Sequence, residues 1–170
     1  IQNLKINYNL NKYEIYLLNT IYAEMHIIDH NVKSAYSSYR DAIKSATNDS
    51  QRIKIYNKLI QISEREKDYE NLLIFLDELY KSLSLDSEKK EIKLLSLEYN
   101  KRLKRFDYLV VEIQEMLNQS LFEDKRLFLS VELAKAHYEL GEHLIAEELL
   151  LELVDLYSKK NETAEAYYYL

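Results

Sequence analysis

The chain has 170 residues, of which 47% are hydrophobic, and it contains one glycine, no proline and no cysteine. So few helix-breaking residues predict packed amphipathic helices, and the lack of cysteine excludes disulfide bonds and thiol chemistry. Residues 1–60 carry 8 basic and 5 acidic side chains, residues 61–120 carry 10 and 13, and residues 121–170 carry 5 and 11. This drift toward negative charge argues against a nucleic-acid partner, because phosphates need clustered Lys and Arg.

The sequence has no mark of membrane insertion. Its apolar runs stay below the roughly 18 residues that cross a bilayer, and no basic and then apolar leader opens the chain. We therefore expect a soluble segment, and the composition leaves its compartment, cytoplasmic or periplasmic, undecided. Because the sequence starts at Ile1 without Met and stops within "AYYYL", we expect it to be a fragment of a longer protein.

A period of 37 residues organises the chain. A shift of 37 aligns Val32, Tyr69, Phe106 and His143, and the columns three, seven, ten and eleven positions further on are apolar in every copy. Apolar residues at spacings of three and four predict one buried face of a helix, and a fixed period of this length is typical of stacked helix pairs. The sequence therefore predicts an all-α fold, an α-solenoid of antiparallel helix pairs with about four repeats of 37 residues.

The predicted elements follow this period in chain order. Residues 1–11, which contain "LKINYNLN", alternate like a short strand, but the 37-residue register makes them the tail of a preceding repeat, which we favour. Four repeats are expected at 12–48, 49–85, 86–121 and 122–160, and residues 161–170 start a fifth. First helices are predicted at 13–29, 50–66, 87–103 and 122–140, second helices at 32–46, 69–84, 106–118 and 143–158, and a ninth helix near 162. The predicted start signals are the N-caps Asp86 and Asn161 and a capping box, "SLFE", from Ser120.

The turn inside each repeat explains the single glycine. First helices are predicted to end near His30, Lys67, Lys104 and Gly141, and a second helix begins one or two residues later. Such a tight turn commonly needs a left-handed residue, a conformation that glycine adopts at least cost. Only the fourth repeat has glycine there, so we expect the other three turns to cost from a few tenths to about 1 kcal/mol each.

Residue size varies in step between the two helices of a repeat. Ala23 is followed by Ala35 and Ala134 by Ala146, whereas Ile60 is followed by Leu72 and Leu97 by Leu109. If these columns touch, the helix pairs of repeats one and four lie closer together than those of repeats two and three, because side-chain size at the crossing sets the interaxial distance.

The segment "AKAHYELGEHLIAEELLLELV" resembles the tetratricopeptide repeat, a helix-turn-helix unit. The resemblance assigns the family's Leu-Gly pair to Leu133 and Ala134, its helix-facing Tyr to His137, and its second-helix Ala and aromatic to Ala146 and Leu150. The sequence departs from the family in its period, three residues longer than 34, in its missing Pro, and in the Trp column, which reads Asn19, Tyr56, Lys93 and Ser130. Over residues 12 to 170 the resemblance implies a right-handed superhelix whose first helices line a concave, peptide-binding face.

On that face the resemblance places a mixed set of polar side chains. Asn57 and Gln61 can hydrogen-bond a peptide backbone, and Arg65, Lys101, Arg102 and Lys135 can hold acidic side chains. The predicted partner-binding residues are Asn57, Gln61, Arg65, Lys101, Arg102, Lys135 and Tyr138; the alternative interpretation is an ordinary solvated helix face. Binding of a chaperone tail is disfavoured, since the family's carboxylate-clamp columns hold Thr20, Glu24, Lys58, Glu91 and Leu95.

The sequence offers little for catalysis. His26 and His30 lie one helical turn apart, a spacing that can seat a metal, with Asp29 adjacent, but no third ligand is evident and packing explains both histidines. There is also no glycine-rich phosphate loop and no nucleophile elbow. We therefore predict no catalytic residue, no cofactor and no metal, and a protein that is not an enzyme.

Two classes of function remain. The first is a non-catalytic scaffold that binds a peptide or a partner helix on the concave face; one form of it is a repeat module of a bacterial envelope assembly lipoprotein, which "YSKKNETAEAYYYL" resembles weakly. The second is a peptide-sensing domain that controls an attached effector domain. Terminal helix pairs lack a neighbour, so we also expect self-association through exposed Ala164, Tyr167, Tyr168 and Leu170.

Overall fold

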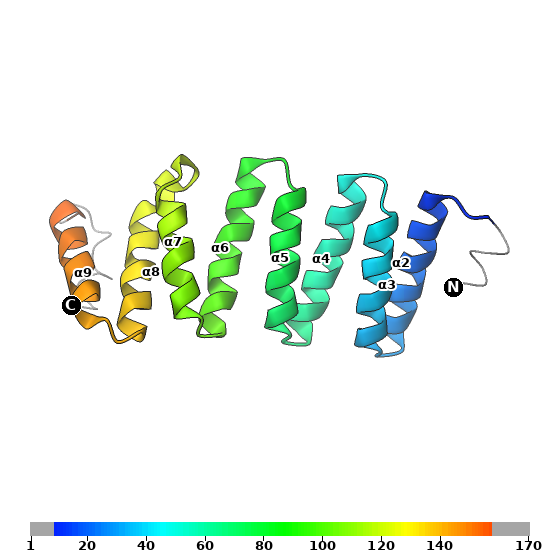
Figure 1. Ribbon diagram of the computed structural model, residues 1–170, viewed down its shortest axis with the longest axis horizontal. Helices are drawn as coiled ribbons and strands as arrows, with labels where there is room; N and C mark the ends of the chain where they lie inside the picture. The colour runs from blue at the N-terminus through cyan, green and yellow to red at the C-terminus, as the bar shows by residue number, and fades with distance from the viewer. Residues whose placement is uncertain (1–8, 158–170) are drawn as a thin grey trace. The chain divides into compact units, whose positions relative to one another are not determined.

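The computed structural model describes residues 9–157, and within this range all regular structure is helical, without a strand. The all-α prediction is confirmed. The elements, drawn in Figure 1, are α2 (Lys12–Ile28), α3 (Val32–Ser45), α4 (Asp49–Arg65), α5 (Tyr69–Ser82), α6 (Asp86–Arg102), α7 (Phe106–Leu117), the 3-10 helix η1 (Ser120–Lys125), α8 (Arg126–Glu139) and α9 (His143–Tyr157). The predicted tail, the ninth helix and the Asn161 cap lie outside the described residues or at their edge, and so do the terminal residues expected to drive self-association.

The chain divides into two compact units inside α6, between Ile92 and Lys93. In the first unit α2 packs against α3, α3 against α4, and α4 against α5. In the second unit α8 packs against both α7 and α9. Neighbours in sequence are therefore neighbours in space within each unit.

Polar residues just before the helices fix where several of them begin. The Asn11 side chain accepts a hydrogen bond from the Glu14 backbone N–H at 3.0 Å, and the Glu14 carboxylate accepts one from the Asn11 N–H at 2.8 Å, which completes a capping box. Asn31, Asn48 and Asp68 cap α3, α4 and α5 in the same way, with bonds of 3.1, 2.9 and 3.3 Å. These caps explain why the predicted helix starts are correct to within a residue for α2 to α5.

Two predicted start signals are wrong. Asp86 is the first residue of α6 and not its N-cap, and Ser120 opens the 3-10 helix η1, whose N-cap Gln119 makes no side-chain hydrogen bond to the backbone of η1. The α-helix begins only at Arg126. Inside η1, Phe122 has non-helical angles, φ −105° and ψ 15°, and its side chain is 2% exposed in the core of the second unit. Burial of this ring replaces the continuous α-helix that the sequence pattern predicts from residue 122.

The four turns that close the first helices lie where the 37-residue period predicts them. His30, Lys67 and Lys104 have left-handed φ of 56°, 56° and 55°, and Gly141 has 79°. Each turn has the same two backbone bonds: in the first, the Asn31 N–H donates to the His26 carbonyl at 2.8 Å and the His30 N–H to the Ile27 carbonyl at 3.1 Å. This is the Schellman arrangement, which satisfies carbonyls at a helix end. The four turns are therefore one structural motif, and only one of them uses glycine.

The core of each unit lies between its helices. In the first unit Tyr39, Ala23 and Leu59 are fully buried, and the rings of Tyr36 and Phe75 meet edge to face at 5.6 Å. The hydroxyls of Tyr36 and Ser63 share a buried hydrogen bond of 2.8 Å, which links α3 to α4. In the second unit the buried residues include Leu97, Leu109, Ile113, Met116, Phe122, Leu129 and Leu133. The alanines at the predicted crossings, Ala23, Ala35, Ala134 and Ala146, are at most 2% exposed, while the relative spacing of the helix pairs stays a prediction.

Candidate functional site

One groove lies between α2 and α4 in the first unit and has a volume of about 260 Å³. We call it the α2–α4 groove; it is lined by Glu24, Ile27, Tyr39, Lys58, Gln61, Ile62 and Arg65. The Lys58 ammonium lies 3.3 Å from the Glu24 carboxylate, and both side chains are 46% exposed. The Arg65 guanidinium pairs with the neighbouring Glu66 at 3.0 Å and is also largely exposed. Such exposed ion pairs contribute little to stability, so these charges can exchange partners at little cost.

The Tyr39 ring forms the floor of the α2–α4 groove. Its hydroxyl is buried and has no hydrogen-bond partner among the residues that the structure describes. Burial raises the pKa of the Tyr39 phenol, and the nearby Glu24 carboxylate raises it further, so the hydroxyl stays protonated. A protonated hydroxyl beside a carboxylate is a hydrogen-bond donor that needs only a small shift of Glu24 to be satisfied.

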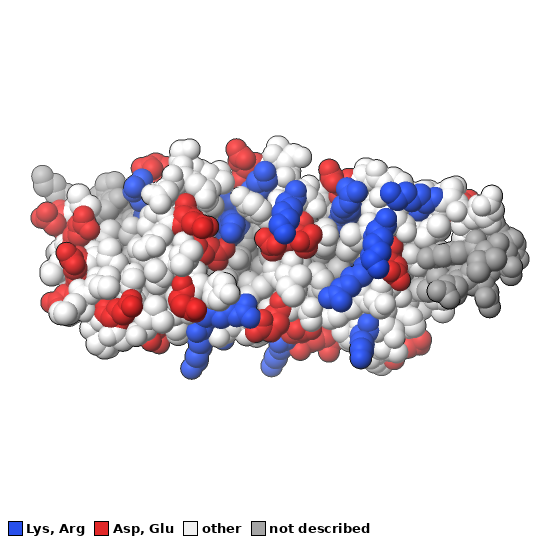
Figure 2. Space-filling model, viewed as in Figure 1, with Lys and Arg blue, Asp and Glu red and all other residues white. Residues whose placement is uncertain are grey.

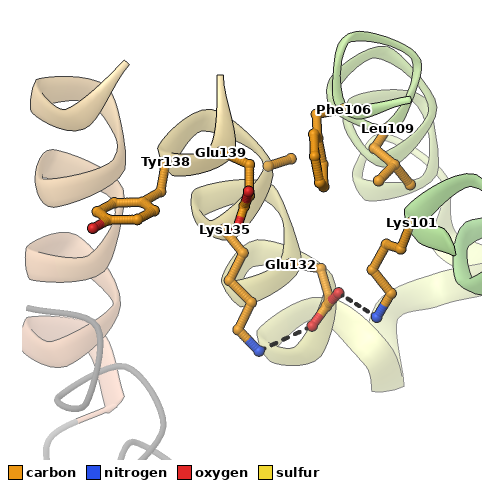
Figure 3. A pocket seen from close by; sticks show the side chains of 8 residues that line it. Lys101, Phe106, Leu109, Glu132, Lys135, Tyr138 and Glu139 are labelled. Atoms are coloured by element: carbon orange, nitrogen blue, oxygen red, sulfur yellow. Dashed lines mark hydrogen bonds and ion pairs between the residues drawn. The ribbon is translucent and has the colours of Figure 1, made fainter. Parts of the chain in front are cut away.

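A second groove, of about 290 Å³, lies in the second unit and is drawn in Figure 3. We call it the α6–α8 groove; it is lined by Lys101, Phe106, Leu109, Glu132, Lys135, Ala136, Tyr138 and Glu139. Figure 3 shows Glu132 between Lys101 and Lys135, with Phe106 and Leu109 beside them. One part of the lining is charged and another is apolar, a combination suited to a side chain that has a carbon body and a polar end.

Glu132 pairs with both lysines of the α6–α8 groove. Its side chain is 8% exposed, and its two oxygens accept bonds from the Lys101 ammonium at 2.8 Å and the Lys135 ammonium at 3.1 Å. Burial raises the pKa of the Glu132 carboxyl, but the two lysines outweigh burial and hold that pKa below its usual value. Burial lowers the pKa of Lys101, whereas Glu132 and Glu98 raise it by more. The cluster is thus a charged triad whose positive ends are already occupied.

Five of the seven residues predicted to bind a partner line one of these grooves. Gln61 and Arg65 belong to the α2–α4 groove, and Lys101, Lys135 and Tyr138 to the α6–α8 groove. Asn57 is exposed but lies outside both linings. Arg102 also lies outside both linings. Its guanidinium pairs with Glu98 at 3.4 Å and lies 5.2 Å from the centre of the Tyr99 ring. The Tyr138 ring is 52% exposed and lies 4.7 Å from the His143 ring.

The two grooves occupy the same place in the 37-residue register. Two periods after Lys58, Gln61 and Arg65 come Glu132, Lys135 and Glu139. At the outer two of these positions the charge is reversed. Glu132 was not among the predicted binding residues, although this register points to it, because it stands where the α2–α4 groove has Lys58.

The histidines lie apart from both linings. His137 is 8% exposed and its Nδ1 lies 2.6 Å from a Glu142 carboxylate oxygen, across the turn that contains Gly141. Within residues 9–157 no group of three or more possible metal ligands gathers, and none of the helices there has the length and apolar content of a bilayer span. On the face drawn in Figure 2, basic and acidic side chains are interspersed.

Comparison of the chain with protein-family models, with curated proteins and with solved structures found no match.

Proposed function

We propose that this chain is a non-catalytic protein-interaction module, an α-solenoid of tetratricopeptide-like helix pairs that binds an extended peptide or a partner helix along its first helices. The observation that carries the proposal is the pair of grooves at equivalent positions of the register, each lined mainly by consecutive first helices. Because the grooves recur with the period of the helices, each can act as one subsite. A series of regularly spaced subsites suits an extended peptide or a helix, whose side chains are also regularly spaced.

The chemistry of the two grooves defines the kind of partner. The α2–α4 groove presents Gln61 and Arg65, which suit backbone carbonyls and acidic side chains. In the α6–α8 groove the lysines are held by Glu132, so the apolar residues Phe106, Leu109 and Ala136 supply the remaining contact surface. We therefore expect a peptide with a polar or acidic residue for the first groove and an apolar residue for the second.

Charge reversal in the first groove tests the proposal. Immobilised protein is used to select binders from a peptide display library, and the selection is repeated with Arg65→Glu combined with Gln61→Ala. The matched control is Lys54→Glu, which makes the same charge change at an exposed residue of α4 outside the groove. We expect the double variant to lose about tenfold or more in affinity for the selected peptides, a loss typical of a contact at the centre of an interface, while Lys54→Glu stays within about twofold.

The outcome that contradicts the proposal is equal affinity for the wild type, the double variant and the control. A companion variant, Tyr138→Ala, examines the second groove, and its ring is exposed enough that its removal leaves the fold intact. The peptide-sensing and envelope-lipoprotein alternatives share this binding step and differ only in what is attached to the helix pairs.

A further inference from the structure

Tyr39 is the one residue of its column in the 37-residue register that carries a polar group. The equivalent residues Leu76, Ile113 and Leu150 are apolar and, like Tyr39, at most 3% exposed. The Tyr39 hydroxyl is buried at the floor of the α2–α4 groove and has no hydrogen-bond partner among residues 9–157. Burial of an unpaired hydroxyl lowers stability, so packing explains the ring of Tyr39 and not its hydroxyl.

The Glu24 carboxylate is an acceptor that lies beside this hydroxyl and lines the same groove. Burial and then this nearby carboxylate raise the pKa of the Tyr39 phenol, so the hydroxyl stays protonated and able to donate. In the structure, however, the carboxylate pairs with the Lys58 ammonium at 3.3 Å, and both side chains of that pair are 46% exposed. Glu24 therefore has two partners within reach, and a small movement exchanges one for the other.

The ion pair at Lys58 differs from the one at the equivalent place in the second unit. There Glu132 is 8% exposed and is held by Lys101 at 2.8 Å and by Lys135 at 3.1 Å. The pair between Glu24 and Lys58 is longer and half-exposed. A half-exposed pair contributes little to stability, whereas a buried pair is costly to break. The charges of the α2–α4 groove can therefore exchange partners, and those of the α6–α8 groove are fixed.

The donors of the α2–α4 groove suit an acidic ligand. Lys58, Gln61 and Arg65 line the groove from one side of α4, and each has an N–H donor. Glu24 is the one acidic residue of the lining, and in its present position it repels a second carboxylate. Once Glu24 turns to the Tyr39 hydroxyl, the Lys58 ammonium is left for the carboxylate of a partner.

We infer that Glu24 is an internal competitor for the ligand of the α2–α4 groove: it holds Lys58 in the unliganded protein and moves to the Tyr39 hydroxyl when a partner's carboxylate takes Lys58. The ligand class is a peptide with an aspartate or glutamate side chain at this subsite. An apolar or basic side chain does not displace Glu24, since it offers Lys58 no negative charge in exchange. The ligand rests on the proposed function, whereas the exchange of partners is a property of the unliganded chain.

Urea unfolding of the unliganded chain tests the exchange. In the wild type, Tyr39→Phe removes an unpaired hydroxyl, so the unfolding constant should stay within about twofold or fall. In Lys58→Met the Glu24 carboxylate turns to Tyr39, so adding Tyr39→Phe should raise the unfolding constant about tenfold. The matched control is Lys54→Met, at an exposed residue of α4 outside the groove, which should leave the effect of Tyr39→Phe as it is in the wild type.

Fluorescence anisotropy measures the consequence for binding. The probes are a labelled peptide with an acidic residue, selected with the wild-type chain, and its copy with glutamine in that place. We expect Glu24→Ala to bind the acidic peptide about tenfold more tightly and Tyr39→Phe about tenfold more weakly, because the first variant removes the competitor and the second its alternative partner. In the Glu24→Ala chain, adding Tyr39→Phe should change affinity by less than about twofold.

Two controls separate these effects from general changes of charge and stability. Asp29→Ala removes a negative charge from an exposed residue at the end of α2 outside the groove, and its affinity should stay within about twofold of the wild type. Tyr36→Phe removes a buried hydroxyl of α3 that bonds Ser63 at 2.8 Å, so it should lower stability and leave affinity unchanged.

The inference is overturned if Tyr39→Phe has the same effect on stability with and without Lys58, or if Glu24→Ala and Tyr39→Phe change affinity independently of each other. Equal affinity for the acidic peptide and its glutamine copy, or a selection that returns no peptide with an acidic residue, overturns the assigned ligand. The proposed function fails on a different result, equal binding by the variant at Gln61 and Arg65, so the two proposals fail separately.

Discussion

Glu132 is the side chain on which the α6–α8 groove depends. Its carboxylate is nearly buried and pairs with both Lys101 and Lys135, so two ion pairs of the cluster meet in one residue. The sequence indicated the two lysines and missed the glutamate, because a contact between residues 31 positions apart is set by how α6 and α8 pack and not by local spacing.

Glu132→Gln should lower the free energy of unfolding by about 1–3 kcal/mol, since the amide keeps one acceptor oxygen, so one lysine loses its hydrogen bond and the other keeps a weaker one. The pKa of Glu132 is lower in the folded chain than its ordinary value of 4.5, so its stabilisation is present above about pH 4.5 and disappears as pH falls through the folded pKa. Urea unfolding between neutral and acidic pH should therefore show a smaller loss of stability for the variant than for the wild type.

Glu98→Gln is the control for this prediction, because Glu98 pairs with the same lysine at 3.4 Å but is 48% exposed. We expect it to change stability by less than about 0.5 kcal/mol at any pH. Identical acid dependence of the Glu132 variant and the wild type would show that the carboxylate is not held by the lysines.

The left-handed turn residues provide a second prediction at this scale. Lys67 has φ 56°, and its replacement by glycine should raise the free energy of unfolding by about 0.5–1 kcal/mol, because glycine adopts this conformation without a steric penalty. Gly141→Ala should lower it by about 1 kcal/mol, and purely through the backbone, since an added Cβ would meet nothing within 4 Å. Urea midpoints measure both effects. Lys67→Ala, which keeps the strain, should be close to neutral, and a gain as large as that of Lys67→Gly would contradict the explanation.

At the scale of the helices, the 37-residue pattern predicted which segments are helical and where first helices end. It predicted them well because apolar spacing, Asn or Asp caps and left-handed turns act locally, as at Asn31 and Asp68. It failed at the start of α8, where the burial of Phe122 decides the local backbone and no local signal reports it. In the grooves the first-helix residues Gln61, Arg65 and Lys101 were predicted from the resemblance, whereas Glu132, which pairs with Lys101 across 31 positions, depends on how the helices pack.

The crossing of α2 and α3 carries the third prediction. Ala23 and Ala35 are fully buried, so Ala23→Leu should force the two helices apart and lower the free energy of unfolding by about 1–3 kcal/mol. In α5 the equivalent residue of the second helix is Leu72, also fully buried, and Leu72→Ala should cost about 2–5 kcal/mol by leaving a cavity.

Thermal or urea unfolding measures both variants, with Ser37→Leu at an exposed site of α3 as the control that adds the same kind of side chain without crowding. If Ala23→Leu is tolerated like the control, the alanine column does not mark a close helix crossing.

On the scale of the whole chain, α2 to α5 and α7 to α9 each pack against the helices next to them in sequence within their unit, and the two units each have their own core. Stability is then nearly a sum of contributions from adjacent helices, and contacts between nearby residues favour rapid folding. The two grooves follow the same order along the chain, because each is lined mainly by first helices.

The link between α2 and α3 leaves no residue unused. Asp29 ends one helix, His30 takes the left-handed conformation, and Asn31 closes the turn through its N–H while its side chain caps the next helix. Inserting even one amino acid there would separate these roles. An epitope tag or a spectroscopic label introduced into the interior of this protein should therefore avoid the four left-handed turns.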